Sequence, residues 1–512
     1  MNAENANQTA PLEARERNIV RLLCVLAAVH VFVFCAAFPI GNNLDEPGHF
    51  DLIIKYAHHH LPHGLEPMCE EASQYMLVYG SPEFRFTAQS LPGGVFPAPS
   101  WAHQRGSEKE ESERAAAFRR ASDSWRGLKN LELWKNYESA QQPLYYAIAG
   151  SWWRLGRGIG LEGLQAVYWV RFLNVLFVAA LVWAGYIVAK LLFPESGFVR
   201  LGVPALLAFL PQQAFYSMQN DVLSPLCFSV VYIGLIKFWR EETPRVASGV
   251  FVGLAMAAAF LVKLSGAPML AVVSAVVMLK LFQARKKAGL RAALPAFIAW
   301  FICAAIPVCA WLAWTRHAFG DFTGTAAKLQ FITWTRKPFA EWWHHPIFSP
   351  QGFWTFVSEL IVNLWQGELT WHNSPLTLPV VDAIYVVVTL AFLALAAVKL
   401  RLANPEQRRA LLLSAALCAS GAAFLAYLSV SYDFGICPSP SKEHPYLVAG
   451  RLVSGALIPF LLLFVHGIRG LLHEAKKWVQ FTALSAILLF MLVSEIVTDW
   501  PVFFSQYNWF HM

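Results

Sequence analysis

Repeated apolar segments, each long enough to cross a lipid bilayer, constrain this chain more than any other feature of its sequence. Of its 512 residues, 56% are hydrophobic and only 14% are charged. A helix of about 20 apolar residues, at about 1.5 Å per residue, crosses a hydrocarbon core of about 30 Å. The sequence therefore predicts an all-α polytopic membrane protein with about 11 transmembrane helices, in a range of roughly 11 to 13. The expected spans are residues 18–40, 166–191, 200–217, 220–239, 247–264, 267–284, 292–314, 379–400, 409–430, 447–467 and 479–498.

Lysine and arginine concentrate in short loops between alternate spans, and this pattern predicts an orientation. Loops rich in these residues stay on the cytoplasmic side of a membrane. With the N-terminal tail 1–17 inside, every basic cluster is cytoplasmic, and three polar regions, 41–142, 315–378 and 431–446, lie outside. The formal charge of +7 reports this orientation and requires no nucleic-acid partner.

The chain divides into a main membrane module and a C-terminal group of helices. The module covers residues 18–314 and includes the long outer loop 41–142, in which we expect helices lying at the membrane interface. A second outer loop, 315–378, precedes the C-terminal helices and outer tail of 379–512. Pro143–Trp153 is apolar but short, so we interpret it as a half-inserted helix. The alternative, a full span, would reverse the sidedness of every later loop.

An acidic pair, Asp45-Glu46, stands directly after the first expected span. Glu46-Pro47 is typical of a helix start. The apolar stripe of this helix consists of Phe50, Ile53, Ile54 and Ala57. Such a helix would lie along the membrane and hold Asp45 at its outer surface, where a carboxylate can act on a substrate that resides in lipid. The alternative is a solvated loop followed by an ordinary helix cap.

Polar residues at the outer ends of other apolar segments are further candidates. An ionisable residue in a span is a functional candidate by default, although one near its end also serves as an interfacial anchor. Arg451 matters most, because a guanidinium can clamp a phosphate through paired hydrogen bonds. Interface anchoring is the alternative for Arg451 and for Lys263. The full set is Gln142, Tyr145, Arg171, Asn220, Asp221, Lys263 and Arg451.

In their order along the chain, these segments resemble the type-C glycosyltransferase superfamily of integral membrane enzymes. The matching features are Asp45-Glu46, the re-entry from Gln142 to Tyr146, Arg171 in Arg-Phe-Leu-Asn, Asn220-Asp221, Lys263 in Lys-Leu-Ser-Gly, and Arg451 in Ala-Gly-Arg. They extend over most of the chain and share one membrane side. The chain looks most like bacterial relatives of protein O-mannosyltransferases and lipid A aminoarabinose transferases, including families with the same Asp-Glu opening.

The resemblance implies an inverting glycosyltransferase, with residues 18–314 as its catalytic module. The sugar donor would be linked to a polyprenyl phosphate, and the acceptor would be a lipid-linked glycan, a cell-envelope polysaccharide or a protein. Asp45, with Glu46 beside it, matches the catalytic acidic position and would act as general base. Arg451 and Lys263 would neutralise the departing phosphate. The remaining donor-binding candidates are Arg171, Tyr145, Gln142, Asn220 and Asp221.

The resemblance also implies a location, a bacterial inner membrane with the site facing the periplasm or the exterior. The chain departs from the mannosyltransferases at Gln142-Pro143, where they often have His-Pro-Pro. It also lacks their large lumenal carbohydrate-binding insertion. Both departures put a protein acceptor in doubt.

Three smaller expectations concern ligands and cross-links. Some relatives bind a divalent ion near the acid, which makes Glu46 and His49 candidate ligands, although no spacing here resembles a closed zinc site. His49, Trp371 and His372 would contact a sugar or an acceptor, with an interfacial aromatic belt as the alternative for Trp371. Cys69 and Cys437 lie in polar outer loops, where a disulfide can form in an oxidising compartment.

Two other classes of protein fit parts of the same pattern. A transporter or flippase of a lipid-linked saccharide would use the same intramembrane cations and aromatic cavity. Such proteins usually carry internal repeats and paired broken helices, and neither is visible in this sequence. A membrane assembly partner without an active site is the third class.

Overall fold

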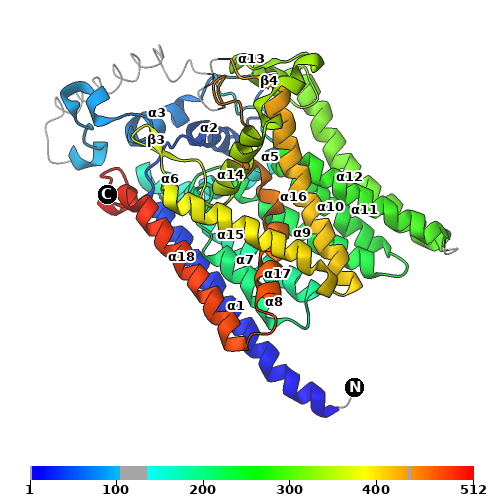
Figure 1. Cartoon of the computed structure of the whole chain (residues 1–512). Coiled ribbons are helices and arrows are strands. Elements are labelled where there is room, and N and C mark those ends of the chain that lie inside the picture. Colours follow the sequence, from blue (N-terminus) through cyan, green and yellow to red (C-terminus); the bar gives the residue numbers. More distant parts are fainter. Residues whose placement is uncertain (1–2, 104–134, 287–288, 436, 438–439) are drawn as a thin grey trace.

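The computed structural model describes residues 3–103, 135–286, 289–435, 437 and 440–512 (Figure 1). Within these ranges, nine helices are long and apolar enough to cross a membrane, and two shorter apolar helices accompany them. These helices fall where the apolar segments predicted them, so the all-α polytopic architecture is confirmed. Residues 104–134 of the outer loop 41–142, where one of the interfacial helices is expected, lie outside the described residues.

The helices of the candidate spans form the bundle, and further helices gather toward the end opposite the N-terminus (Figure 1). The bundle helices are α1 (Ala3–Ala37), α6 (Gly163–Arg171), α7 (Leu173–Leu192), α8 (Gly197–Ala208), α9 (Ser224–Arg240), α10 (Val246–Val262), α11 (Ala267–Lys286), α12 (Leu290–Phe319), α15 (Pro379–Val398), α16 (Pro405–Ser431), α17 (Leu457–Leu471) and α18 (Lys477–Phe503). The other helices are α2 (Glu46–Ala57), α3 (Glu70–Tyr79), α5 (Pro143–Gly158), α13 (Thr325–Phe331) and α14 (Pro350–Trp365). Two short antiparallel pairs join β1 (Thr335–Arg336) to β4 (Tyr432–Asp433) and β2 (Thr370–Trp371) to β3 (Ser374–Pro375).

Basic loops meet at the end of the bundle that carries the N-terminus. Glu16 of α1 pairs with Arg200 of α8 at 2.7 Å, and Arg240 of α9 pairs with Glu406 of α16. The three polar regions meet at the other end, where β1 of the second region pairs with β4 of the third. The side chain of Asn43, from the first region, donates to the Glu368 carbonyl in the second. The charge pattern therefore separates the two ends of the bundle as predicted.

Helix α2 begins at Glu46, as predicted, and it is covered by α3 and α5. Gly150 of α5 allows the close approach, because a Cβ there would lie 2.8 Å from the Ala57 backbone nitrogen of α2. With 16 residues, α5 extends about 24 Å, less than the hydrocarbon core of about 30 Å. It lies along α2, where it supports the segment that carries Asp45.

Two expected spans are shorter than predicted because their ends unwind beside the polar residues. Helix α8 ends at Ala208 rather than at 217, since Pro211 disfavours a helical conformation in the residue before it. Helix α17 begins at Leu457 rather than at 447, after a 3-10 segment over Gly450–Ala456. Non-helical backbone at membrane depth is tolerated where protein buries it. This unwinding places Arg451 inside the protein.

Candidate functional site

Asp45 occupies the junction between α1 and α2 in a left-handed conformation, with φ 62° and ψ 14°. Non-glycine residues rarely adopt this region, although Asp is enriched there, and such residues cluster at functional sites. Asp45 stands at the N-cap position of α2, but its side chain makes no capping hydrogen bond and is directed to other partners. Its Oδ1 accepts from the Tyr137 hydroxyl at 2.5 Å, and its Oδ2 accepts from Arg451 Nη2 at 3.3 Å. About a quarter of the Asp45 side chain, 24%, is exposed.

Arg451 stands among three carboxylates that come from distant parts of the chain. Besides Asp45, its guanidinium lies 3.7 Å from Asp221 Oδ2 and 4.0 Å from Glu368 Oε2. The Gln219 side-chain oxygen accepts a further bond at 3.3 Å. In the part of the chain that the structure describes, the buried Nε of Arg451 and Oε1 of Glu368 have no hydrogen-bond partner. The arrangement therefore retains hydrogen-bonding capacity that a polar ligand can use.

A second cation, Lys263, lies behind Arg451. Its ammonium group is 2.8 Å from Asp221 Oδ2 and donates to Asn220 Oδ1 at 3.0 Å. The Asn220 amide in turn donates to Gln141 Oε1, which ties this pair to the start of α5. Gln142 accepts from the backbone nitrogen of Leu264 at 3.0 Å. The predicted residues Asp45, Gln142, Asn220, Asp221, Lys263 and Arg451 thus gather in one region.

Glu46 and Arg171 lie elsewhere, in a separate buried ion pair. The Arg171 guanidinium is 2.6 Å from Glu46 Oε1, and neither side chain is exposed. Glu46 also accepts from the backbone nitrogens of Gly41 and Met218. Both oxygens of this carboxylate are therefore already occupied by donors. The Tyr145 hydroxyl is buried and has no hydrogen-bond partner among the described residues.

His49 is buried next to the site, with Nδ1 2.6 Å from the Tyr146 hydroxyl. Burial lowers the pKa of His49 to about 4, opposed by the Glu138 carboxylate and reinforced by the Lys263 ammonium, so the ring is neutral at pH 7. Its Nε2 has no hydrogen-bond partner within the described ranges.

The candidate metal ligands do not fit a metal ion. Glu46 is committed to Arg171 and to backbone nitrogens, so its oxygens are not available to share an ion with His49. Over the described residues, no group of three or more His, Cys, Asp or Glu side chains is arranged to hold a metal.

Three further candidates, Trp371, His372 and Cys69, have contacts of their own in the structure. Trp371 and His372 stack on each other with ring centroids 5.2 Å apart, and they pack against Phe84 and Phe96 of the first outer region. The disulfide expected between Cys69 and Cys437 is not formed, because Cys69 is a free thiol. Cys69 is the N-cap residue directly before α3, and its backbone nitrogen donates to Asp51 of α2 at 2.7 Å.

Sequence reasoning missed four residues of the site: Tyr137, Glu138, Lys328 and Glu368. Glu138 pairs with Lys328 at 2.5 Å. Burial raises the pKa of the Glu138 carboxyl, but the charge of the Lys328 ammonium and its hydrogen bond to this carboxylate outweigh burial and hold the pKa below its ordinary value. Burial, with the Asp221 and Asp45 carboxylates, raises the pKa of Glu368 against the opposing effect of Arg451. In the sequence, these four residues are distinguished only by their polar character within the outer loops.

The sequence profile of a family described as a predicted membrane protein (DUF2142) matches residues 28–435. The chain belongs to this family. The matched region includes Asp45, Asp221, Lys263 and Glu368, and it ends before Arg451. No curated protein matches the chain.

Among solved structures, this DUF2142 member is similar to the archaeal oligosaccharyltransferase AglB from Archaeoglobus fulgidus, in complex with an inhibitory peptide and a dolichol-phosphate. The sequence identity is 11% and the TM-score is 0.40, with 94% of this chain covered. The chain spans 56% of the length of the AglB chain.

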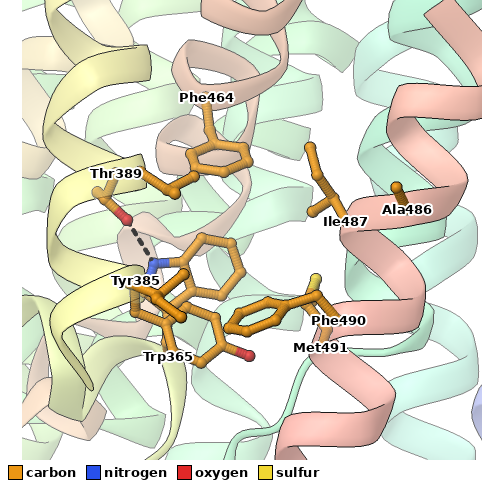
Figure 2. A pocket seen from close by; sticks show the side chains of 10 residues that line it. Trp365, Tyr385, Thr389, Phe464, Ala486, Ile487, Phe490 and Met491 are labelled. Atoms are coloured by element: carbon orange, nitrogen blue, oxygen red, sulfur yellow. Dashed lines mark hydrogen bonds between the residues drawn. The ribbon is translucent and has the colours of Figure 1, made fainter. Parts of the chain in front are cut away.

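The DUF2142 member also contains an apolar cavity of about 230 Å³ among α15, α17 and α18. Figure 2 shows Trp365, from the end of α14, reaching into this cavity, where its indole nitrogen donates to Thr389 at 2.9 Å. Trp365 is three residues before Glu368 in the sequence. The cavity is therefore joined by a short loop to the polar site, but it holds none of the site's charged groups.

Proposed function

We propose that this protein is a membrane glycosyltransferase that moves a sugar from a polyprenyl-phosphate donor to a hydroxyl acceptor outside the cytoplasm, with inversion at the anomeric carbon. One observation supports this most directly. A partly exposed carboxylate, Asp45, faces a guanidinium, Arg451, whose side chain is 16% exposed, at 3.3 Å, at the end of the bundle away from the basic loops. A base and a cation placed together suit an in-line displacement. In such a reaction the anomeric carbon gains a bond to the acceptor oxygen on one side and loses its bond to the phosphate oxygen on the other.

In this mechanism Asp45 accepts the proton of the acceptor hydroxyl as the acceptor oxygen attacks the anomeric carbon. The bond from that carbon to the phosphate oxygen breaks, and its electron pair leaves with the lipid phosphate. Arg451 stabilises the negative charge that develops on the phosphate, since a fixed cation costs no reorganisation at the moment of reaction. Lys263 adds a second positive charge behind it.

The balance of charge in the site bears on how an anionic lipid would bind. Two cations, Arg451 and Lys263, face the carboxylates of Asp45, Asp221 and Glu368. Burial raises the pKa of Glu368, so this carboxyl takes up a proton more readily than an exposed one, and once protonated it would repel an incoming phosphate less. We assign Nε of Arg451 to this phosphate, because among the described residues it has no hydrogen-bond partner and its nearest carboxylate oxygen, Glu368 Oε2, is 4.0 Å away.

The supporting roles follow from the contacts. Asn220 and Asp221 hold Lys263, and Gln142 fixes the backbone of Leu264 beside it. Glu46 and Arg171 shape the turn after α1 and do not contact substrate. We place the reaction at the outer face of a bacterial inner membrane, with a glycan of the cell envelope or a lipid-linked glycan as acceptor.

The test is glycosyl transfer in vesicles that contain the purified full-length chain and polyprenyl-phosphate sugars as donors. Asp45→Asn should abolish transfer, while the donor still binds, because the amide cannot accept the acceptor proton. Asp433→Asn, an exposed carboxylate of β4, is the matched control and should retain transfer. Normal transfer by Asp45→Asn would remove this residue from the chemistry. Movement of lipid-linked saccharide across the vesicle without any transfer would favour the transporter class instead.

A further inference from the structure

The Asp45 carboxylate has no free oxygen in this structure. Arg451 donates to Oδ2, and the Tyr137 hydroxyl donates to Oδ1 at 2.5 Å. A general base must accept a hydrogen bond from the hydroxyl that it deprotonates, at a heavy-atom distance of about 2.6–3.2 Å. Tyr137 makes this kind of bond already.

Tyr137 is held in this position by contacts with α13 in the second outer loop. Its ring stacks on Phe331, with centroids 6.0 Å apart, and the Lys328 ammonium lies 5.2 Å from the ring centroid. The next residue, Glu138, forms the 2.5 Å ion pair with the same Lys328. Lys328 and Phe331 are three positions apart on α13, so one face of this short helix holds both Tyr137 and Glu138.

The start of α13 presses closely on the same segment. Gly324 precedes the helix with φ +68°, and a Cβ at this position would lie 2.5 Å from the Ala140 Cβ. Glycine therefore permits both the left-handed turn and the close approach. Segment 137–140 and α13 form one packed unit over Asp45.

The phenol is suited to occupying this position without reacting. Burial, with the Asp45 and Glu138 carboxylates, raises the pKa of Tyr137 well above its ordinary value. The hydroxyl therefore keeps its proton and acts as a donor to the carboxylate.

Resting on the proposed function, we propose that the Tyr137 hydroxyl marks the binding position of the acceptor hydroxyl, and that Tyr137 must leave Asp45 before an acceptor binds. The Glu138–Lys328 ion pair is the latch that holds Tyr137 in place. The acceptor therefore reaches Asp45 between segment 137–140 and α13, from the outer side of the protein, while the lipid phosphate approaches from the side of Arg451. The ligand class at this position is an alcohol of an outer-face molecule.

The first measurement does not depend on any substrate. A water-soluble carbodiimide with glycinamide labels accessible carboxyl groups, and peptide mass spectrometry locates the label on Asp45. Tyr137→Phe keeps the ring and removes only the hydroxyl, so Asp45 should label about five-fold faster, the size expected for one net hydrogen bond. Lys328→Gln should also accelerate labelling, because it opens the latch. Lys442→Gln, which removes an exposed lysine near Asp433, is the matched control.

The second measurement is transfer to added acceptor. Tyr137→Phe should lower the acceptor KM and increase cleavage of the donor by water, while Tyr75→Phe on α3 should change neither. Unchanged labelling of Asp45 in both Tyr137→Phe and Lys328→Gln overturns this inference whatever the transfer assay gives. Faster labelling with loss of transfer in Tyr137→Phe also overturns it, because the hydroxyl would then take part in the reaction. Faster labelling with no transfer by the unmodified protein counts against the proposed function and supports Tyr137 as the cover of Asp45.

Discussion

Glu46 and Arg171 form an ion pair of 2.6 Å from which solvent is fully excluded. The neighbouring carboxylate, Asp45, belongs to a different set of contacts and stays partly exposed. The two halves of the acidic pair therefore have different roles. Glu46 anchors the turn between α1 and α2, and this anchor fixes the left-handed conformation that directs Asp45 toward Arg451.

Replacing Arg171 with methionine should destabilise the protein strongly. Removing one partner of a buried ion pair leaves the other charge uncompensated, at a cost of about 3–5 kcal/mol. Thermal unfolding in detergent should show a large fall in the melting temperature for Arg171→Met. Arg336→Met, which alters an exposed arginine of β1, is the control and should unfold near the unmodified protein. Equal melting temperatures for the two variants would contradict a structural role for the Glu46–Arg171 pair.

The sequence alone predicts the number and positions of the bundle helices because long apolar segments have few other stable arrangements in lipid. It also predicts Asp45, Asp221, Lys263 and Arg451 as candidates, since ionisable groups inside the apolar segments or at their outer ends are few in this sequence. The different roles of Asp45 and Glu46 could not be predicted, because they depend on the left-handed conformation of Asp45 and on the ion pair between Glu46 and Arg171.

The contributions of Tyr137 and Glu368 could not be predicted for a different reason. Both residues lie in long polar loops, where periodicity carries no information about tertiary contacts. Glu368 reaches Arg451 because the loop after α14 packs against the turn between α1 and α2, where the backbone nitrogen of Thr370 donates to the Asn43 side chain. The 3-10 conformation of Gly450–Ala456, before α17, could not be predicted either, because the apolar composition of this segment is typical of a continuous helix.

Arg451→Lys should reduce transfer by roughly 10²-fold although it preserves the charge. A lysine ammonium cannot make the forked contacts by which the guanidinium approaches Asp45, Gln219 and Glu368 at once. Loss of one preorganised donor to a developing negative charge costs on the order of 10²–10³ in rate. Initial rates of sugar transfer at saturating donor measure this effect. A lysine variant with an unreduced rate would show that only charge matters at this position.

His49 should make the protein less stable in mild acid. Its pKa in the folded protein is about 4, below the ordinary value of about 6.5, so only the unfolded chain takes up the proton between these values. Stability from this group is complete above about pH 6.5 and is lost as pH falls toward 4, by at most about 3 kcal/mol. The melting temperature of His49→Gln should therefore fall less between pH 7 and pH 4.5 than that of the unmodified protein. His444→Gln, at an exposed histidine, should follow the unmodified protein.

Glu368 should have the opposite pH dependence. Because its pKa is raised in the folded protein, its contribution is present in full below its ordinary pKa of about 4.3 and is lost as pH rises through the higher value. Glu368→Gln mimics the protonated form, so it should gain stability relative to the unmodified protein as pH increases from 4.5 to 8. Melting temperatures at several pH values measure this difference, with Glu359→Gln as the exposed control. If the difference in melting temperature between Glu368→Gln and the unmodified protein stays constant with pH, folding does not raise the pKa of Glu368.

The hydrogen bond in the apolar cavity gives a prediction that is independent of the polar site. The indole nitrogen of Trp365 donates to Thr389 Oγ1 at 2.9 Å, and both residues are buried (Figure 2). Thr389→Val keeps the shape of the side chain but leaves this donor unsatisfied, at a cost of about 1–3 kcal/mol. Thr389→Ser keeps the hydroxyl and should retain most of the stability, although it removes a methyl group. Thermal unfolding should therefore rank the unmodified protein first, Thr389→Ser second and Thr389→Val last. A serine variant less stable than the valine variant would show that packing of the methyl group, rather than the hydrogen bond, determines the role of Thr389.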